Sequence, residues 1–360
     1  MEWLKREKHN LSKDNRNGGF DLQKIKVAVI YGGKSSEHEV SLKSAFGVIK
    51  AMSSDKYDIL PIGITKEGRW VTGELGELMA DGQSMRLGEE EFLLYPDGQN
   101  NKGLKIDVVF PVMHGTYAED GAIQGLLELT GIPYVGCGIA SSAIAFDKDL
   151  TKRMVSLLNL AQADYVAVEK YNYQAKLKEA TERIGFPCFV KPARQGSSVG
   201  IFKVNSEAEL RSAVEKSFAY DSKVMIEEFI SGREIEISVL GNEYPEASLP
   251  GEIISAAEFY DYEAKYSSNS TRLNIPADVS GEQIADMQQR AKLIYQTLGC
   301  RGLARVDFFL THKDNTFCFN EINTMPGFTP MSMYAKMWEA AGLKYADLLD
   351  KLIELALKKD

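Results

Sequence analysis

The pattern of apolar and polar residues in the first third of the chain predicts buried strands that alternate with helices. The apolar run "KIKVAVIYGG" ends in two glycines, which is typical of a buried strand that leads into a tight turn. The next stretch, "SSEHEVSLKSAFGVIKAM", has apolar residues at helical spacing, and Ser36 with Glu39 fits a capping box. The runs "KIDVVFPVMHG" and "IPYVG" predict further strands, and "EDGAIQGLLELTG" between them predicts a helix with acidic residues in its first turn. Because strands and helices alternate up to about residue 136, we expect a parallel α/β domain.

The pattern changes after this point and predicts an α+β architecture with mostly antiparallel pairing. A helix-rich stretch begins at "FDKDLTKRMVSLLNLA", and "FPCFVKPARQGSSVGIFKV" predicts two strands joined by a glycine- and serine-rich loop. In "KVMIEEFISGREIEISVLG", Ile235, Ile237 and Val239 alternate with polar residues, so we expect one face of this strand to be buried. The last third adds a polar stretch rich in tyrosine, then a helix, a hairpin and a C-terminal helix with an apolar stripe.

Size and composition mainly exclude classes of protein. A chain of 360 residues exceeds the roughly 250–300 residues at which one core usually stops growing, so we expect two or three domains. The formal net charge of -9 argues against a nucleic-acid surface, and no apolar run approaches the roughly 18 residues of a membrane span. The four cysteines form no C-x-x-C pair, which disfavours a zinc site and suits a reducing compartment. Residues 1–24 are polar and lack the apolar segment of a signal peptide, so we expect a disordered extension and a cytoplasmic protein.

The hairpin "ARVDFFLTHKDNTFCFNEINTMPG" carries the first candidate chemistry. Residues two apart in a strand share a face, so Arg305 points with Asp307 and Glu321 points with Asn323. A turn near Asp314 would place Asp307 opposite Glu321, where two carboxylates about 4 Å apart repel by roughly 4 kcal/mol at an effective dielectric constant near 20. These side chains offer only oxygen, which suits Mg²⁺ or Mn²⁺. The alternative is a surface hairpin in which Arg305 pairs with Asp307 and Glu321 is solvated.

The loop in "VKPARQGSSVG" is a second candidate, for an anion. Lys191 lies at a strand end, and the glycines and serines that follow let backbone N–H groups and hydroxyls approach a phosphate. The chain has no Walker motif, and a plain flexible turn is the alternative. Combined with lysines and a separate oxygen-only metal site, however, the loop meets the needs of a nucleoside triphosphate.

Two residues near strand ends stay open between structural and functional roles. Glu37 lies near a helix start, where favouring the helix dipole and cap would be worth about 0.3–1 kcal/mol. His114 ends a strand and has either a structural or a substrate-binding role. The stretch "YGGKSSEHE" lacks G-x-G-x-x-G, so it does not predict NAD binding.

Taken together, these motifs closely resemble those of the D-alanine–D-alanine ligase family. The resemblance runs from about Lys24 to the C terminus through "GGKSSEHEVSLKSA", "HGTYAEDGAIQG", "FVKPARQGSSVG", "EFYDYEAKY" and "RVDFFLTHKDNTFCFNEINTMPGFTPMSM". It implies an ATP-grasp fold in which a Rossmann-like parallel α/β domain at 25–136 precedes a central subdomain at 137–227 and a C-terminal subdomain at 228–360 with a lid loop and a metal site. It also implies ATP-dependent ligation of two D-alanines through an acyl phosphate, for peptidoglycan precursor synthesis, by a homodimer that needs neither nucleic acid nor membrane.

The resemblance implies a role for each matching residue in binding ATP and metal. Two Mg²⁺ or Mn²⁺ ions would be held by Asp307, Glu321 and Asn323. The ATP phosphates would be contacted by Lys148, Lys191, Ser198 and Lys265. The stretch "VMIEEFI" would hold adenine through backbone groups and side chains of Glu227 and Ile230. The ribose hydroxyls would be bound by Glu234.

The resemblance implies a second set of residues for the amino-acid substrates. Glu37 would hold the ammonium of the first D-alanine through a chain with Ser197 and Tyr266, and His114 would lie nearby. The oxyanion of the tetrahedral intermediate would be stabilised by Arg305. The carboxylate of the second substrate would be bound by Gly327 and Ser332.

Three alternatives remain at this point. The pattern "YDYEAKY" favours D-alanine as the second substrate, whereas ligases of the same fold use D-serine or D-lactate. A non-catalytic nucleotide sensor would need neither Arg305 nor Tyr266. The family usually has glycine where Ala118 stands, and if that position needs a positive φ, alanine costs about 1 kcal/mol or more. Residues 1–24 have no counterpart in the family.

Overall fold

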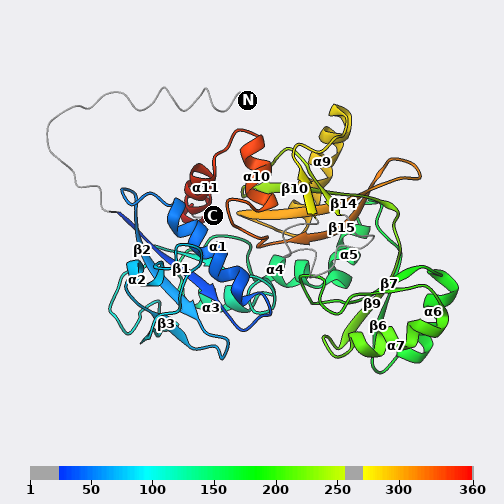
Figure 1. Ribbon diagram of the computed structural model, residues 1–360, viewed down its shortest axis with the longest axis horizontal. Helices are drawn as coiled ribbons and strands as arrows, with labels where there is room; N and C mark the ends of the chain where they lie inside the picture. Colours follow the sequence, from blue (N-terminus) through cyan, green and yellow to red (C-terminus); the bar gives the residue numbers. More distant parts are fainter. Residues whose placement is uncertain (1–23, 256–270, 359–360) are drawn as a thin grey trace.

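The computed structural model describes residues 24–255 and 271–358. This part of the chain contains three β-sheets with helices packed around them (Figure 1). The first sheet has the strand order β4-β3-β2-β1-β5. Its strands are β1 (Ile25–Gly32), β2 (Tyr57–Ile64), β3 (Trp70–Thr72), β4 (Glu90–Glu91) and β5 (Val108–Val112). Strand β1 pairs in parallel with β2 and β5, whereas β3 and β4 add antiparallel strands at one edge. The predicted parallel α/β arrangement is therefore confirmed for β2, β1 and β5.

Two details of the predicted helices are wrong. Helix α1 (His38–Ala51) begins without a side-chain capping bond, so the capping box of Ser36 and Glu39 does not form. Helix α3 (Ala122–Thr130) has no acidic residue in its first turn. The carboxylate of Asp120 lies before this helix and accepts a hydrogen bond from the backbone N of its first residue at 3.0 Å. Helix α1 starts one residue later than a Ser36 cap would place it, and α3 starts three residues after Glu119, where its polar pattern begins.

In the loop after β5, the position of Ala118 does not need a positive φ. This alanine is buried and does not have a positive φ. The left-handed conformation falls on Tyr117 instead, at φ 68°. Alanine therefore adds no strain of that kind at its position. Further along, "IPYVG" makes a single parallel bridge, between Tyr134 and Val109, in place of a full strand.

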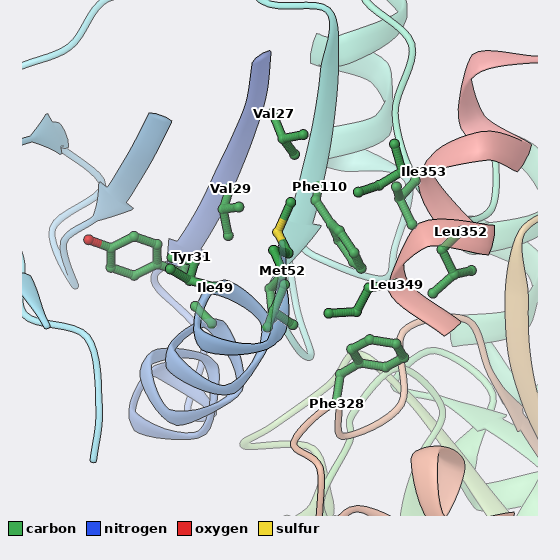
Figure 2. Close-up of a cluster of buried hydrophobic side chains, with 14 of the residues drawn as sticks. Val27, Val29, Tyr31, Ile49, Met52, Phe110, Phe328, Leu349, Leu352 and Ile353 are labelled. Atoms are coloured by element: carbon green, nitrogen blue, oxygen red, sulfur yellow. The ribbon is translucent and has the colours of Figure 1, made fainter. Parts of the chain in front are cut away.

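The C-terminal helix packs on the N-terminal sheet. Helix α11 (Tyr345–Leu357) lies beside α1 and β5, and Figure 2 shows its aliphatic side chains facing them. The predicted apolar stripe is confirmed, and its buried members are Leu348, Leu349, Leu352 and Ile353. Phe328 fills the space between the helix and the sheet, with its ring centroid 5.9 Å from that of Phe110. This packing holds the segment after the hairpin against the first domain.

The second sheet is antiparallel and has the strand order β6-β9-β7-β8. Its strands are β6 (Tyr165–Glu169), β7 (Cys188–Pro192), β8 (Phe202–Val204) and β9 (Lys223–Glu228). The chain enters this sheet through α4 (Ile139–Phe146) and α5 (Lys148–Ser156), and α6 (Tyr173–Arg183) and α7 (Glu207–Ser217) follow β6 and β8. Helices α6 and α7 share one apolar core with the strands, and α4 and α5 connect this part to the first sheet (Figure 1). The strand–loop–strand expected around "ARQGSSVG" is confirmed as the antiparallel pair β7–β8.

The third sheet has the strand order β13-β12-β10-β14-β15, with β11 paired to β10. Its strands are β10 (Gly232–Leu240), β11 (Glu246–Ala247), β12 (Gly251–Ser255), β13 (Thr271–Asn274), β14 (Leu303–Thr311) and β15 (Phe317–Asn323). Its flanking helices are α9 (Gly281–Thr297) and α10 (Met333–Ala340). Helix α9 starts with a complete capping box between Ser280 and Gln283. In the described part of the chain, no helix is both long and apolar enough to cross a membrane.

Both faces of β10 are buried, which differs from the expectation of one buried face. Ile235, Ile237 and Val239 form the apolar face, as predicted, and share a core with α9. On the opposite face Ser238 is also fully buried, and its hydroxyl donates to the carbonyl of Tyr334 in α10 at 3.2 Å. Ser238 is therefore enclosed between the sheet and α10.

Candidate active site

A row of charged side chains crosses the neighbouring strands β10, β14 and β15 of the third sheet. Asp307 on β14 lies opposite Glu321 on β15, and opposite Glu236 on β10 on its other side. Arg305 and Asn323 pair with each other in the neighbouring row. The predicted register of the hairpin is therefore confirmed, and Glu236 is an additional carboxylate that the hairpin sequence did not reveal. The available signal in the sequence was that Glu236 lies between Ile235 and Ile237, on the polar face of β10.

Arg305 is a buried cation that links this row. Its Nε and Nη2 each lie 2.7 Å from one oxygen of Asp307, and Nε lies 3.1 Å from Glu236 Oε2. Asn323 Nδ2 donates to the same Asp307 carboxylate at 2.9 Å. Burial alone would lower the pKa of Arg305, but Asp307 and then Glu236 raise it well above its ordinary value. The Arg305–Asp307 pair of the surface-hairpin alternative is present, but it is largely removed from solvent, with the Arg305 side chain 18% exposed and Asp307 buried.

Lys148 connects the hairpin to the glycine- and serine-rich loop. Its Nζ donates to the carbonyl of Gln195 at 2.8 Å and lies 3.5 Å from Glu321 Oε2. Positive charge therefore meets both hairpin carboxylates, from Arg305 on one and from Lys148 on the other. Two carboxylates and one amide, without nitrogen or sulfur ligands, match the oxygen preference of Mg²⁺. Within residues 24–255 and 271–358, no group of three or more His, Cys, Asp or Glu side chains converges as a metal site.

A second buried ionic cluster lies in the middle sheet around Glu227. Lys191 forms an ion pair with this carboxylate, and Lys152 Nζ approaches its Oε1 to 2.7 Å. Burial would raise the pKa of Glu227, but the two lysines together lower it. Lys152 was missed in the sequence, although it lies four residues after Lys148 and so on the same face of α5.

The loop between β7 and β8 reaches the residue before α1 through Ser197. Ser197 and Ser198 both have left-handed backbones, at φ 51° and 59°, which is uncommon for residues other than glycine. Ser197 Oγ donates to Glu37 Oε1 at 2.5 Å. Glu37 occupies the position before α1 without capping it, so its proposed capping role is wrong and its carboxylate serves this contact instead. An added Cβ on Gly115 or Gly196 would lie 2.6 or 3.0 Å from Glu37 Oε2, so two backbones approach that carboxylate closely.

His114 and Glu119 join the loop after β5 to the turn after β15. His114 Nδ1 lies 3.0 Å from the carbonyl of Met325, so Nδ1 carries the proton and Nε2 accepts from Ser44 Oγ at 3.0 Å. Burial lowers the pKa of His114, which keeps it neutral. The carboxylate of Glu119 accepts from Gly115 N at 2.8 Å and from Met325 N at 3.0 Å. Glu119 was not selected from the sequence, although it lies within the motif "HGTYAEDG".

The remaining predicted residues lie around these contacts. Gly327 is half-buried two residues after Met325, and Ser332 precedes α10, where its Oγ accepts from Thr329 N at 3.0 Å. Ile230 is half-buried between β9 and β10. Glu234 is half-buried near the start of β10. Lys265 and Tyr266 lie outside the described residues.

Two features together are typical of the ATP-grasp class of enzymes. Lys191 and its glycine- and serine-rich loop lie on one antiparallel sheet, and the hairpin carboxylates lie on another. Solved structures agree with this fold. The VanG D-Ala:D-Ser ligase from Enterococcus faecalis matches with a TM-score of 0.84 and 39% identity, over 93% of this chain and 100% of that one. The D-alanine–D-alanine ligase from Coxiella burnetii matches with a TM-score of 0.79 and 38% identity, over 93% of this chain and 94% of that one.

Sequence comparisons identify the family within this class. Residues 26–137 match the D-ala D-ala ligase N-terminus and residues 154–354 match the D-ala D-ala ligase C-terminus. D-alanine–D-alanine ligase B of Clostridium tetani is 46% identical over 348 residues, which is 94% of this chain and 96% of that protein. The D-alanine–D-alanine ligase of Geobacillus kaustophilus is 46% identical over 351 residues, which is 93% of this chain and 95% of that protein. The chain belongs to the D-alanine–D-alanine ligase family and is therefore a ligase.

Proposed function

We propose that this enzyme joins two D-alanines to D-alanyl-D-alanine at the expense of ATP, for peptidoglycan precursor synthesis. The carboxylate of the first D-alanine attacks the γ-phosphorus of ATP, and ADP leaves. The amine of the second D-alanine then attacks the acyl phosphate, and inorganic phosphate leaves. The observation that carries the proposal is that Lys148 touches both the loop between β7 and β8 and the hairpin, while the same loop touches Glu37 of the first domain.

ATP would lie between the second and third sheets. Phosphoryl transfer depends on positioning and charge neutralisation, and Lys148, Lys191 and Lys265 supply the cations. The left-handed backbone at Ser198 helps turn the loop around an anion. The adenine would be held by Glu227 and by the segment that reaches Ile230. The ribose hydroxyls would be held by Glu234, near the start of β10.

Two divalent cations, Mg²⁺ or Mn²⁺, would be held by Asp307, Glu321 and Asn323. The oxygen-only donor set fits such ions, and the row holds a third carboxylate, Glu236, beside the single guanidinium of Arg305. When bound, the ions supply further neutralisation of phosphate charge. The protein's own part is to keep these oxygens in register across β14 and β15.

The first D-alanine would bind between the first domain and the loop. The Glu37 carboxylate would take its ammonium group, with Ser197 holding that carboxylate in place at 2.5 Å and Tyr266 completing the chain. The neutral imidazole of His114 adds no charge beside this pair. A fixed carboxylate thus leaves the substrate carboxylate directed away from Glu37 by charge repulsion.

Arg305 would stabilise the negative oxygen of the tetrahedral intermediate. Asp307 and Glu236 hold its guanidinium in a buried position, so little reorganisation is needed as charge develops. The carboxylate of the second D-alanine would be bound near Gly327 and Ser332. These two residues are close in space, since a Cβ on Gly327 would lie 3.4 Å from Ser332 Oγ.

An assay for ADP release tests this function. The purified protein is expected to release ADP only when ATP, Mg²⁺ and D-alanine are all present. The double variant Asp307→Asn/Glu321→Gln should lose far more than threefold in rate, since it removes both carboxylates from the donor set; a rate within about threefold of wild type contradicts the metal assignment. Absence of D-alanine-dependent ADP release from the wild type contradicts the function itself.

D-serine is the second candidate acceptor, because the match to the VanG D-Ala:D-Ser ligase has a TM-score of 0.84. The "YDYEAKY" pattern favours D-alanine, but it lies outside the described residues. The same assay with D-alanine, D-serine and D-lactate compares these acceptors, and a range of pH separates D-lactate from the two amino acids, because an amine must be unprotonated to attack. Preference for D-serine, or for D-lactate at neutral pH, contradicts the D-alanine assignment. Membership of a ligase family leaves the non-catalytic sensor without support.

Three further points remain part of the proposal. All four cysteines are buried free thiols, which supports a cytoplasmic location. The homodimer is carried over from the family resemblance, and sedimentation of the purified protein tests it. The domain divisions at 25–136, 137–227 and 228–360 are tested by limited proteolysis, which should cut between units before it cuts within them.

A further inference from the structure

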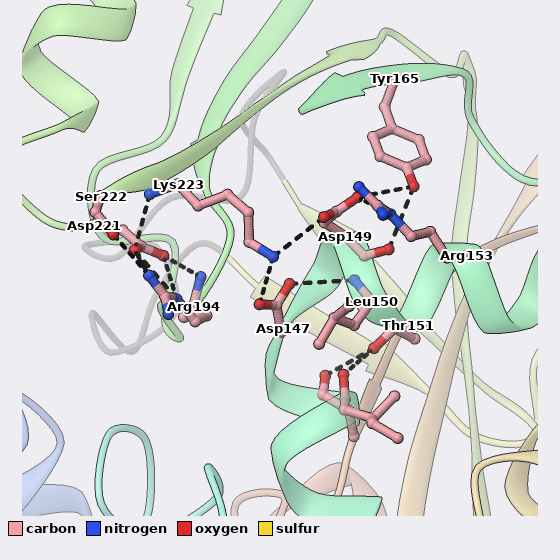
Figure 3. Close-up of polar contacts among 12 residues, drawn as sticks. Asp147, Asp149, Leu150, Thr151, Arg153, Tyr165, Arg194, Asp221, Ser222 and Lys223 are labelled. Carbon is pink, nitrogen blue, oxygen red and sulfur yellow. Dashed lines mark hydrogen bonds and ion pairs between the residues drawn. The ribbon is translucent and has the colours of Figure 1, made fainter. Parts of the chain in front are cut away.

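An ionic network joins the start of α5 to the start of β9, next to the residues assigned above (Figure 3). Lys223 is its centre, with Nζ 2.6 Å from Asp147 Oδ2 and 3.2 Å from Asp149 Oδ2. All three side chains are at least five-sixths buried, since their exposed fractions are 14%, 7% and 4%. An ion pair network at this depth is screened little by solvent, so it restrains the two chain segments that it joins.

Lys148 lies between the two carboxylates that Lys223 holds. Asp147 is the N-cap of α5, and its side chain accepts from the third backbone N of the helix. Lys148 is the first residue of the helix, and its backbone N donates to the carbonyl of Ala193 at 3.0 Å. Ala193 N in turn donates to the carbonyl of Lys223 at 2.9 Å. Lys223 therefore supports Lys148 twice, through its side chain on α5 and through its backbone on the loop.

A neighbouring ion pair, between Arg194 and Asp221, holds the base of the same loop. The backbone N of Arg194 donates to Asp221 Oδ2 at 2.7 Å, and its Nη2 lies 2.5 Å from Asp221 Oδ1. Asp221 also accepts from the backbone N of Lys223 at 3.1 Å. Figure 3 shows the two parts of the network side by side, with Lys223 between them. The loop base and the start of α5 are thus tied to one residue of β9.

Loss of the Lys223 ammonium would leave Asp147 beside Lys148 without that counter-charge. Asp149 would keep its bond from Arg153 Nε, at 2.9 Å. The Asp147 carboxylate would then compete for the Lys148 ammonium with the Gln195 carbonyl and with Glu321. Because charges at hydrogen-bonding distance interact strongly when buried, this competition would turn Lys148 away from the loop and the hairpin.

We propose that Lys223 is a positioning residue for ATP, which acts by holding Asp147 and Asp149 so that Lys148 keeps its contacts with Gln195 and Glu321. The proposal rests on the proposed function, because Lys148 is assigned there to the ATP phosphates. Lys223 itself has no contact with the reacting atoms in this assignment.

Steady-state kinetics of Lys223→Met test the proposal. The KM for ATP should rise about tenfold while the KM for D-alanine stays within about twofold, because the hydrogen bond between Ser197 and Glu37 is not touched. Lys223→Arg should restore the KM for ATP to within about threefold of wild type, since a guanidinium can bridge two carboxylates. Arg183→Met is the control, because it removes an ion pair between α6 and Asp164, the residue before β6, and should change neither KM.

A double variant separates positioning from a general structural effect. If Lys223 acts through Lys148, then Lys148→Met/Lys223→Met has the same KM for ATP as Lys148→Met alone. Two effects that multiply contradict the proposal, as does an unchanged KM for ATP in Lys223→Met. If the wild type itself releases no ADP with D-alanine, the proposed function fails instead.

A milder variant keeps the test available if Lys223→Met does not fold. Lys223→Gln retains a hydrogen-bond donor for Asp147 but removes the counter-charge. The KM for ATP should rise at least about threefold in Lys223→Gln, and should return towards the wild-type value when Asp147→Asn is added, because the carboxylate that competes for Lys148 is then absent. An unchanged KM for ATP in Lys223→Gln also contradicts the proposal.

Discussion

Ser197 Oγ donates a hydrogen bond to Glu37 Oε1 at 2.5 Å, although 160 residues separate the two in the chain. The contact joins the glycine- and serine-rich loop of the second sheet to the residue that precedes α1 in the first domain. The carboxylate proposed to bind the substrate ammonium therefore lies beside the loop proposed to hold the ATP phosphates.

The first prediction concerns this hydrogen bond. Ser197→Ala should lower kcat/KM for D-alanine about tenfold or more, because the Glu37 carboxylate loses the donor that orients it. The KM for ATP should change by less than about twofold, since Ser197 is not assigned to the phosphates. ADP release at varied D-alanine concentration measures both quantities. A variant whose kcat/KM for D-alanine equals that of wild type would show that Glu37 needs no such partner.

The second prediction concerns the space beside Glu37. Gly196 does not have a positive φ, so Gly196→Ala acts through contact, with its Cβ 3.0 Å from Glu37 Oε2. The carboxylate must shift, and the KM for D-alanine should rise about tenfold. Gly125→Ala is the matched control, because Gly125 lies in α3 and its added Cβ meets no atom within 4 Å. That control should leave the KM for D-alanine unchanged and raise the free energy of unfolding by about 0.5–1 kcal/mol.

The third prediction concerns the buried pair of Lys152 and Glu227. The Lys152 side chain is only 1% exposed, so Lys152→Met leaves a buried carboxylate with Lys191 as its remaining partner among the pairs described above. The free energy of unfolding should fall by roughly 3 kcal/mol, as measured by urea denaturation. Lys176→Met, which removes a half-exposed pair with Glu179, should cost less than about 0.5 kcal/mol. Equal losses in the two variants would mean that burial adds nothing to the Lys152 pair.

The fourth prediction concerns the pH dependence of stability. Burial, and then the charge of Glu37, raise the pKa of Glu119 from 4.5 to about 8. The folded protein therefore holds this proton more tightly than the unfolded chain. The resulting stabilisation is complete below pH 4.5 and is lost as the pH rises through about 8. Between these values the free energy of unfolding of wild type should fall more steeply with pH than that of Glu119→Gln, in urea titrations at a series of pH values. Parallel profiles for the two proteins would contradict the raised pKa.

Local pattern was sufficient for much of the fold and for part of the site. The apolar runs predicted β1, β5 and the β7–β8 pair, and the alternation of Arg305, Asp307, Glu321 and Asn323 predicted the register of the hairpin. Side chains along a strand alternate with a period of two, and a short turn joins the two strands of the hairpin. The local sequence alone therefore determines which side chains face one another. The motifs also identified the family, because several of them occur in the family's order.

Only the tertiary structure decided which of these residues have partners from distant segments. Glu37 does not cap α1 but meets Ser197, and Glu119 joins two turns about 200 residues apart, at Gly115 and Met325. Lys152 and Lys223 look like ordinary helix and strand lysines in the sequence, yet both are buried against carboxylates. The physical reason is that burial and ion pairing depend on how sheets and helices pack, and periodicity along the chain carries no information about that packing.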